Sequence, residues 1–239
     1  MAIALVTNVT IPALFGSPST SSAINTTGAS LLIVVASNFS SDLYSPTDSK
    51  GNTYTSLTRV ASVGNTARIW YCANPTVGSG HTFTLTRVND LAFGISGCAA
   101  AFSGVATTSP FDVENGTATY GASGVTGSVT PSNDNELILA GVGFWTGGTP
   151  AVMSINSSMS ITDQVVDSNA NSTSGSALAY FVQGTAAAIN PTWTSTVNPT
   201  VLNAFIASFK AAAASGGGPI VRGGSIMHGT IVRGGRIAA

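Results

Sequence analysis

The chain has 239 residues, of which 44% are hydrophobic and only 7% are charged, and its formal net charge is −1. Ordinary soluble domains carry roughly 25% charged residues, so surface polarity here must come from Ser, Thr, Asn and Gly. Disordered chains combine low hydrophobicity with high charge, which excludes that class. The small number of basic residues argues against nucleic acid as a partner, because that binding depends on clustered Lys and Arg.

The N-terminal segment, residues 1–10, lacks the basic and long apolar regions of a signal peptide. No stretch of the sequence reaches the ~18 apolar residues that a membrane span needs. We therefore expect a soluble protein that is made in a cytoplasm and contacts no membrane.

Segments of β character recur along the chain. The apolar run 31–36 is followed by strands predicted over 53–60 and 66–72, with a Gly64–Asn65 turn between them. Residues 81–88 alternate, so that Phe83 and Leu85 face one side and threonines face the other, a period of two that marks a half-buried strand. Further strands are predicted over 91–103, 136–145, 160–166, 177–183, 192–197 and 201–209.

Turn-forming pairs such as Ser45–Pro46, Asn74–Pro75 and Asn198–Pro199 separate these strands. Many short strands with such breaks, and no alternation of strands with helices, are typical of a sandwich or jelly roll. The predicted fold class is therefore all-β, an antiparallel jelly-roll-like β-sandwich over residues 1–212 with an extended C-terminal arm.

The segment 201–210 leaves two alternatives open. Val201, Leu202, Phe205, Ile206 and Phe209 would line one face of a helix, whereas alternation places Val201, Phe205 and Phe209 on one side of a strand. We favour the strand, because a sandwich needs its last strand to close the sheet.

The composition changes at a Gly-rich linker, residues 213–218, and an arm follows over 219–239. The arm repeats Ile-Val-Arg-Gly-Gly at a period of 11 residues, too short for either unit to form its own core. It is either a frayed tail or an assembly arm that adds strands to a neighbouring subunit. The assembly residues would be Ile220, Val221, Arg222, Ile226, Ile231, Val232, Arg233 and Ile237.

The residues that carry chemistry are sparse, and no catalytic, cofactor-binding or metal site is predicted. The two histidines, His81 and His228, lie in a strand and in the arm, and no Gly-x-Ser-x-Gly motif occurs. Acids such as Asp48 sit at turns, where they normally cap the backbone. Asp112 and Glu114 lie two residues apart and could project to the same side of a strand.

Three further motifs have structural interpretations. Cys72 and Cys98 lie in apolar strand-like segments, which favours their interpretation as buried free thiols. A disulfide between them remains an alternative, because the sequence gives no distance between the two residues. Gly141 and Gly143 interrupt an apolar strand that lacks the following helix of a dinucleotide site. The run Asp48 to Asn52 carries too few acids for calcium and predicts a hairpin turn.

The aromatic residues suggest one possible binding surface. They are Trp70, Trp145 and Trp193, with Tyr44, Tyr54, Tyr71, Tyr120 and Tyr180. They could include a stacking platform for a glycan, but aromatic residues in strands more often pack in the core or across strands.

A series of short motifs carries a resemblance to a known group. Residues 48–54 and 67–72 are followed by 101–105, 109–112 and 135–139, which read DSKGNTY, ARIWYC, AFSGV, SPFD and NELIL. This order resembles jelly-roll-like modules of virion proteins of tailed phages and of some bacterial surface proteins, and it covers most of residues 1–212. The resemblance implies a structural or adhesive role with no catalytic residues to carry over.

The expected function is therefore a non-enzymatic structural protein of a tailed-phage virion, a capsid decoration or head-fibre protein located in the particle. Its partners would be other virion proteins, either the major capsid or neck and tail subunits, and further copies of itself in a homo-oligomer. The alternatives are a tail or fibre component that binds a host surface glycan, and a bacterial surface adhesin module, which the missing signal peptide disfavours.

Overall fold

The computed structural model describes residues 1–15, 18–39, 43–62, 64–87, 94–166, 174–198 and 201–213. This part of the chain contains no helix, and so none that could cross a membrane. All of its strand ladders are antiparallel, so the predicted antiparallel all-β fold is confirmed. The predicted assembly arm and most of its linker lie outside the described residues.

The strands form two similar halves along the chain. The first half contains β1 (Ala4–Phe15), β2 (Ser19–Thr20), β3 (Leu31–Asn38), β4 (Thr47–Asp48), β5 (Thr55–Ser56), β6 (Val60–Ser62), β7 (Asn65–Ala73), β8 (Phe83–Leu85) and β9 (Gly94–Ser103). The second contains β10 (Phe111–Thr119), β11 (Ser123–Val125), β12 (Glu136–Trp145), β13 (Met153–Ile155), β14 (Ser160–Val165), β15 (Ser174–Gln183), β16 (Thr192–Ser195) and β17 (Val201–Phe209).

The two halves have the same strand order. Each contributes an inner sheet, β1-β9-β3-β7-β5 with β6 also on β7 in the first half, and β10-β17-β12-β15-β14 in the second. Each also contributes a three-stranded outer sheet, β2-β8-β4 and β11-β16-β13. When β1 is matched to β10, β3 to β12, β7 to β15 and β9 to β17, the orders coincide. The chain therefore contains an internal structural duplication.

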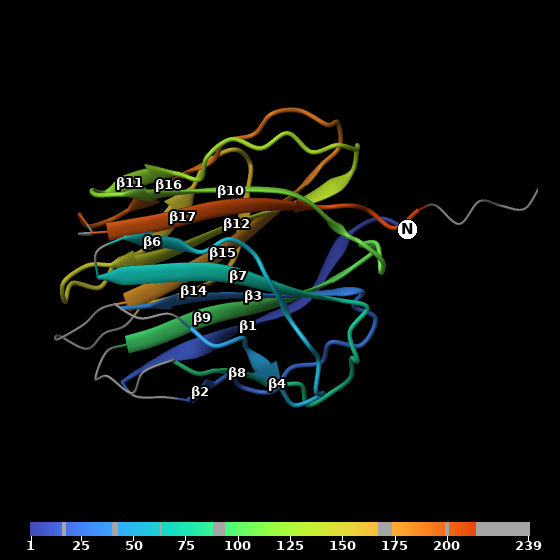
Figure 1. Cartoon of the computed structure of the whole chain (residues 1–239), viewed down its shortest axis with the longest axis horizontal. Coiled ribbons are helices and arrows are strands. Elements are labelled where there is room, and N and C mark those ends of the chain that lie inside the picture. The colour runs from blue at the N-terminus through green and yellow to red at the C-terminus, as the bar shows by residue number, and fades with distance from the viewer. Residues whose placement is uncertain are drawn as a thin grey trace, which may run out of the picture.

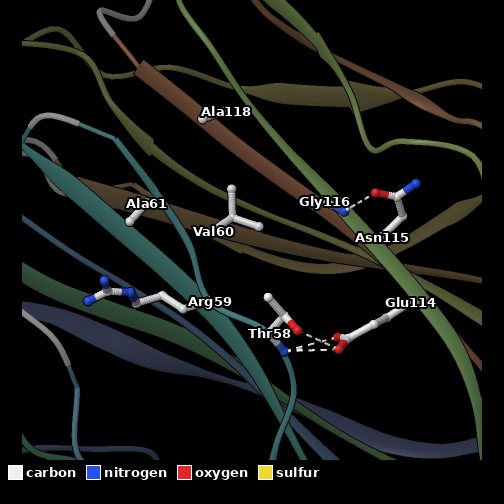
Figure 2. Close-up of a pocket in the computed structure, with 8 residues that line it drawn as sticks. All are labelled: Thr58, Arg59, Val60, Ala61, Glu114, Asn115, Gly116 and Ala118. Carbon is white, nitrogen blue, oxygen red and sulfur yellow. Dashed lines mark hydrogen bonds between the residues drawn. The ribbon is translucent and has the colours of Figure 1, made fainter.

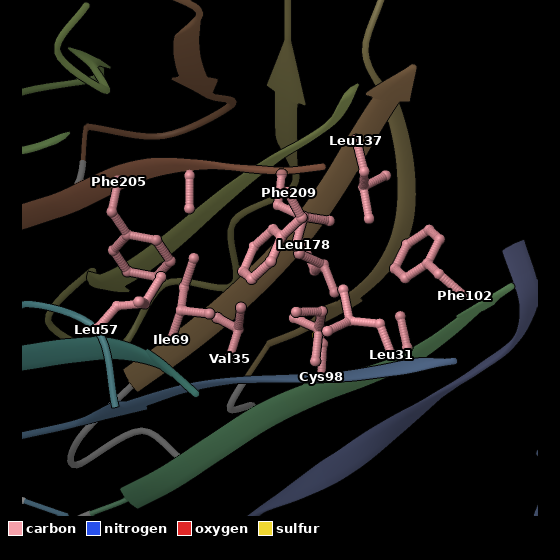
Figure 3. Packing of buried hydrophobic residues seen from close by; sticks show 14 of the residues in the cluster. Leu31, Val35, Leu57, Ile69, Cys98, Phe102, Leu137, Leu178, Phe205 and Phe209 are labelled. Atoms are coloured by element: carbon pink, nitrogen blue, oxygen red, sulfur yellow. The ribbon is translucent and has the colours of Figure 1, made fainter. Parts of the chain in front are cut away.

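The four sheets stack as layers, with the inner sheets face to face and an outer sheet on each side (Figure 1). Leu31, Ile33 and Val35 face the second inner sheet, where Leu137 and Leu139 meet them (Figure 3). Leu32 and Val34 on the same strand pack instead against the first outer sheet, with Phe83 and Leu85. A third cluster around Phe144 and Trp193 fills the space under the second outer sheet. Strands β3, β9, β12 and β17 are consequently buried on both faces, which explains their nearly continuous apolar sequences.

Side-chain pairs at matched positions relate the halves by a pseudo-two-fold axis. Leu31 pairs with Phe102 and Ala73, and the matched Leu137 pairs with Phe209 and Val182. In this register Phe102 corresponds to Phe209 and Tyr71 to Tyr180. The rings of Phe102 and Tyr180 meet edge to face at 5.3 Å, and those of Phe209 and Tyr71 do so at 5.2 Å. The same contact is thus made twice between the inner sheets, as a fused dimer would make it.

The opposite end of the inner core is polar. Asn65, Ser174, Ser37 and Asn203 are fully buried there. Asn203 Nδ2 donates to Asn65 Oδ1 at 2.7 Å, and the hydroxyls of Ser37 and Ser174 lie 3.1 Å apart. Phe39 and Trp145, which also correspond in the two halves, pack together at 5.0 Å. A buried, hydrogen-bonded set of this kind fixes the alignment of two sheets more sharply than apolar contact alone.

Several strands differ from expectation. The segment 201–209 is a strand and not a helix, and its nine residues are all buried, so a helical stripe and a two-sided strand fit its sequence equally well. Residues 53–60, expected as one strand, form only β5 and the start of β6. The long strands β1 and β10 were not predicted. Both are sheet edges that are only partly buried, and their apolar pattern is correspondingly weak.

Candidate functional site

A groove of about 420 Å³ opens along one side of the sandwich, where an edge of each inner sheet is exposed (Figure 2). Residues 58–61, which lead into and form part of β6, line one wall, and residues 114–116 and 118 of β10 line the other. Both β6 and β10 end their sheets, since β6 pairs only with β7 and β10 only with β17. We call this feature the edge groove.

A carboxylate crosses the edge groove and joins its walls. Glu114 on β10 accepts hydrogen bonds from the Thr58 hydroxyl at 2.7 Å and from the Thr58 backbone N–H at 3.0 Å (Figure 2). Beyond this contact the walls touch at Gly116, where an added Cβ would lie 2.4 Å from Val60 Cγ2. A larger residue at position 116 would therefore force the Val60 side chain to shift.

The matching edge on the far side of the pseudo-two-fold axis is closed differently. Asn8 on β1 occupies the position that Glu114 has on β10. Asn8 pairs with Ala100, two residues before Phe102, and Glu114 pairs with Ala207, two residues before the matched Phe209. Asn8 Nδ2 donates to Asp163 Oδ2 at 2.6 Å and to the Thr162 carbonyl at 3.2 Å. Burial raises the pKa of Asp163 above its ordinary value, although the bond from Asn8 opposes the rise.

A hydroxyl, an imidazole and a carboxylate also meet in line inside the first half. Thr26 Oγ1 lies 2.8 Å from His81 Nδ1, and His81 Nε2 lies 3.2 Å from Asp48 Oδ2. The kinds of group match those of a hydrolytic triad. All three side chains, however, are fully buried, and the Thr26 oxygen already accepts the Gly78 N–H at 3.1 Å. Their chemical effect in this structure is to join the loops beside the first outer sheet.

Asp48 caps its own turn, as predicted. Its carboxylate accepts the backbone N–H groups of Lys50 and Asn52 and the hydroxyl of Tyr54, the last at 2.7 Å. Burial alone would raise the pKa of Asp48, but these hydrogen bonds together hold it below its ordinary value. Burial and the neighbouring carboxylate raise the pKa of Tyr54. Residues 48–52 therefore form a structural turn.

The two acids Asp112 and Glu114 are held by different partners. Asp112 accepts the N–H and hydroxyl of Ser132, each at 2.7 Å, and lies 3.4 Å from Lys210 Nζ. Glu114 instead turns to Thr58 across the edge groove. The ladder from β10 to β17 is irregular between Phe111 and Glu114, which breaks the simple alternation expected from sequence.

The aromatic residues proposed for a glycan platform are mostly internal. Trp70, Trp193 and Tyr54 are buried, and Tyr71 and Tyr180 belong to the paired contacts between the inner sheets. Only Tyr44 and Tyr120 of the eight are largely exposed, at 52% and 62%. Within the described residues, most of these aromatic side chains thus pack inside the fold, as the more common interpretation predicted, and Tyr44 and Tyr120 are the exceptions.

The cysteine and metal predictions can also be placed. Cys72 and Cys98 are both free and buried, as predicted, and burial raises the pKa of each thiol. Gly141 and Gly143 lie in β12, where an added Cβ on Gly143 would lie 2.5 Å from the Ala67 Cβ of the facing sheet. Within the described ranges, no three His, Cys, Asp or Glu side chains gather where they could hold a metal ion.

A second groove, of about 440 Å³, lies where the first and last described residues meet. It is lined by residues 1–3, Ala211 and Ala212, with Val182 and the exposed Asp134 beside them. Asp134 Oδ1 accepts the Ala186 N–H at 2.7 Å. This groove marks the end of the sandwich from which the arm sequence continues.

Sequence reasoning missed the residues that form the edge groove, in particular Thr58, Val60 and Gly116. The available signal was a glycine inside the polar segment 111–119, together with two acids at alternate positions. Comparison with known proteins gave no match, whether with protein-family models, curated sequences or solved structures.

Proposed function

We propose that this chain is a non-enzymatic structural protein of a tailed-phage virion, acting as a capsid decoration or head-fibre protein. The observation that carries the proposal is the edge groove, in which two unpaired sheet edges face one opening on the four-layer body. Unpaired edges are the places where β proteins join other chains. A body of this kind is suited to assembly with neighbouring subunits.

The chemistry of the described residues supports a structural role. The one set of groups that resembles a catalytic triad, Thr26, His81 and Asp48, is fully buried and lines neither groove. The acids Asp112 and Glu114 are engaged by different partners. Each of these groups stabilises the fold through hydrogen bonds that it already makes.

The strand order supports the resemblance to jelly-roll modules. Strands β1-β9-β3-β7 share one sheet of the first half and β2-β8-β4 share the other, so successive strands alternate between sheets as they do in a jelly roll. The second half repeats this arrangement in β10-β17-β12-β15 and β11-β16-β13. One difference is that β5 and β6 pair with β7 and not with β4. We propose that each half is one jelly-roll-like unit and that the chain is a fused pair of them.

Purified phage particles that carry the gene for this chain provide the test. Density-gradient-purified virions should contain the chain in a fixed ratio to the major capsid subunit, and imaging with an antibody should place it on the head. Its presence in the soluble fraction alone would contradict a virion role. Turnover of an ester or glycan substrate that His81→Ala abolishes would contradict the non-enzymatic role.

A further inference from the structure

The edge groove is the place where the pseudo-symmetry of the sandwich is broken. On the closed side, β14 is a six-residue strand that lies against the edge strand β1. The matching segment of the first half, residues 55–60, is split into β5 and β6, with Leu57, Thr58 and Arg59 between them. A single continuous edge strand thus exists in one half only, with one irregularity in its ladder between Ile161 and Asp163. The break between β5 and β6 in the other half leaves the edge groove open.

The opening has the properties of a strand-addition site. Along residues 114–118, β10 spans about 13 Å at roughly 3.3 Å per residue. The walls combine aliphatic contact from Val60, Ala61 and Ala118 with one carboxylate, Glu114, and one guanidinium, Arg59. Because β10 pairs with β17 alone, its outer side can accept a further strand.

The arm sequence complements this body in charge. All nine acidic residues lie within residues 1–213, together with five of the eight basic ones, so the body carries 5 − 9 = −4. The remaining three, Arg222, Arg233 and Arg236, lie in residues 214–239, which contain no acid. Arg222 and Arg233 occupy the same place in the two Ile-Val-Arg-Gly-Gly units, so either could approach Glu114 while the flanking aliphatic residues meet the apolar wall.

We propose that the edge groove receives an Ile-Val-Arg-Gly-Gly unit from the arm of a second copy of this chain, which adds as a strand to β10. This inference rests on the proposed assembly function and names the segment and the receptor that would carry it out. The 26 residues beyond position 213 reach up to about 85 Å when extended, which is enough to cross to a neighbouring molecule.

The direction of the chain favours a second copy over the arm of the same molecule. Phe209, at the end of β17, pairs with Phe111 at the start of β10. The arm therefore leaves the body at the end where β10 begins. If it entered the edge groove of its own molecule directly, it would run in the same direction as β10 and pair parallel to it. Described ladders are all antiparallel, and parallel pairing is slightly less stable per residue. An arm from a neighbour can enter from the Thr119 end and pair antiparallel.

Cross-linking of full-length chains tests the pairing. One variant carries Ala118→Cys in the edge groove, and the other carries Gly218→Cys at the end of the linker, because an antiparallel arm that places Arg222 at Glu114 brings position 218 opposite Ala118. The native thiols of Cys72 and Cys98 are buried and give little background. After mixing and oxidation with diamide, we expect a disulfide-linked heterodimer, which an excess of a free peptide of residues 219–229 should suppress. Ala13→Cys, near the corresponding end of β1 at the closed edge, is the matched control and should cross-link at least tenfold less.

Three outcomes would overturn the inference: no heterodimer, equal cross-linking of the Ala13→Cys control, or an intrachain disulfide without any heterodimer in an Ala118→Cys, Ser225→Cys double variant, whose two positions meet only when an arm that places Arg222 at Glu114 runs parallel to β10. The last would assign the edge groove to the arm of the same molecule.

A charge exchange gives an independent readout. Glu114→Lys should weaken self-association about two- to fivefold, as expected for an exposed ion pair. Adding Arg222→Glu and Arg233→Glu should restore self-association. If Glu114→Lys acts only by removing the Thr58 contact, these two substitutions will not restore self-association. If the cross-link fails while the chain still enters virions in a fixed ratio, the pairing is wrong and the virion role stands. If the cross-link forms but the chain is absent from virions, the pairing stands and the virion role is wrong.

Discussion

The duplicated aromatic contact between the inner sheets gives a quantitative test of the fold. The side chain of Phe209 is fully buried and meets the ring of Tyr71 edge to face at 5.2 Å. Replacing a buried phenylalanine with alanine typically costs about 3–5 kcal/mol, because it removes apolar contact and leaves a cavity. Phe209→Ala should therefore remove a large part of the roughly 5–15 kcal/mol that stabilises an ordinary protein.

The pseudo-two-fold axis sharpens this expectation. Phe102 is also fully buried and meets Tyr180 at 5.3 Å, so Phe102→Ala should cost the same as Phe209→Ala to within about 1 kcal/mol. For a chain of this size, each kcal/mol lowers the melting temperature by about 2–4 °C. Either variant should accordingly melt about 6–20 °C below the parent protein.

Urea unfolding followed by far-ultraviolet circular dichroism, together with calorimetry, measures both losses. Tyr120→Ala is the control, since this side chain is 62% exposed and should change the unfolding free energy by less than about 0.5 kcal/mol. A loss below about 1 kcal/mol at either phenylalanine would refute the packing described for the inner core. A difference above about 2 kcal/mol between them would refute the equivalence of the two halves.

The remaining predictions concern glycine, carboxyl and thiol groups. Gly143→Ala should cost about 1–3 kcal/mol in chemical unfolding because its Cβ meets the facing sheet, whereas Gly184→Ala, with open space around it, should be neutral or slightly stabilising. Asp48→Asn should lower the free energy of unfolding at pH 7. The difference from the parent protein should shrink as the pH falls through the lowered pKa of Asp48, because the parent carboxyl then becomes protonated. Equal differences at pH 7 and pH 2.5 would contradict this. Asp163→Asn should behave oppositely, neutral or stabilising at pH 7 and converging with the parent below the raised pKa of Asp163. Iodoacetamide should leave Cys98 unmodified in the folded protein and label it in urea; rapid labelling without denaturant would show that the inner core is open.

Local sequence determined the class of the fold and much of its strand content. The alternation of Phe83 and Leu85 with threonines appears directly in burial, since both apolar side chains are fully buried and Thr82, Thr84 and Thr86 are only partly buried. Glu136–Trp145 and Val201–Phe209 are strands at the bounds that their apolar runs predict. Such patterns are readable because a strand places successive side chains on opposite faces, whatever it later pairs with.

Tertiary structure alone decided the duplication and the edge groove. Phe102 matches Phe209 and Tyr71 matches Tyr180, but few other matched residues are identical. The repeat is therefore evident in the strand order and not in the sequence. The contact of Glu114 with Thr58, the approach of Gly116 to Val60, and the meeting of Thr26, His81 and Asp48 all join residues more than 20 positions apart. Pairing between strands distant in sequence depends on which faces and edges remain free after the layers have packed, and a local apolar pattern does not record that choice.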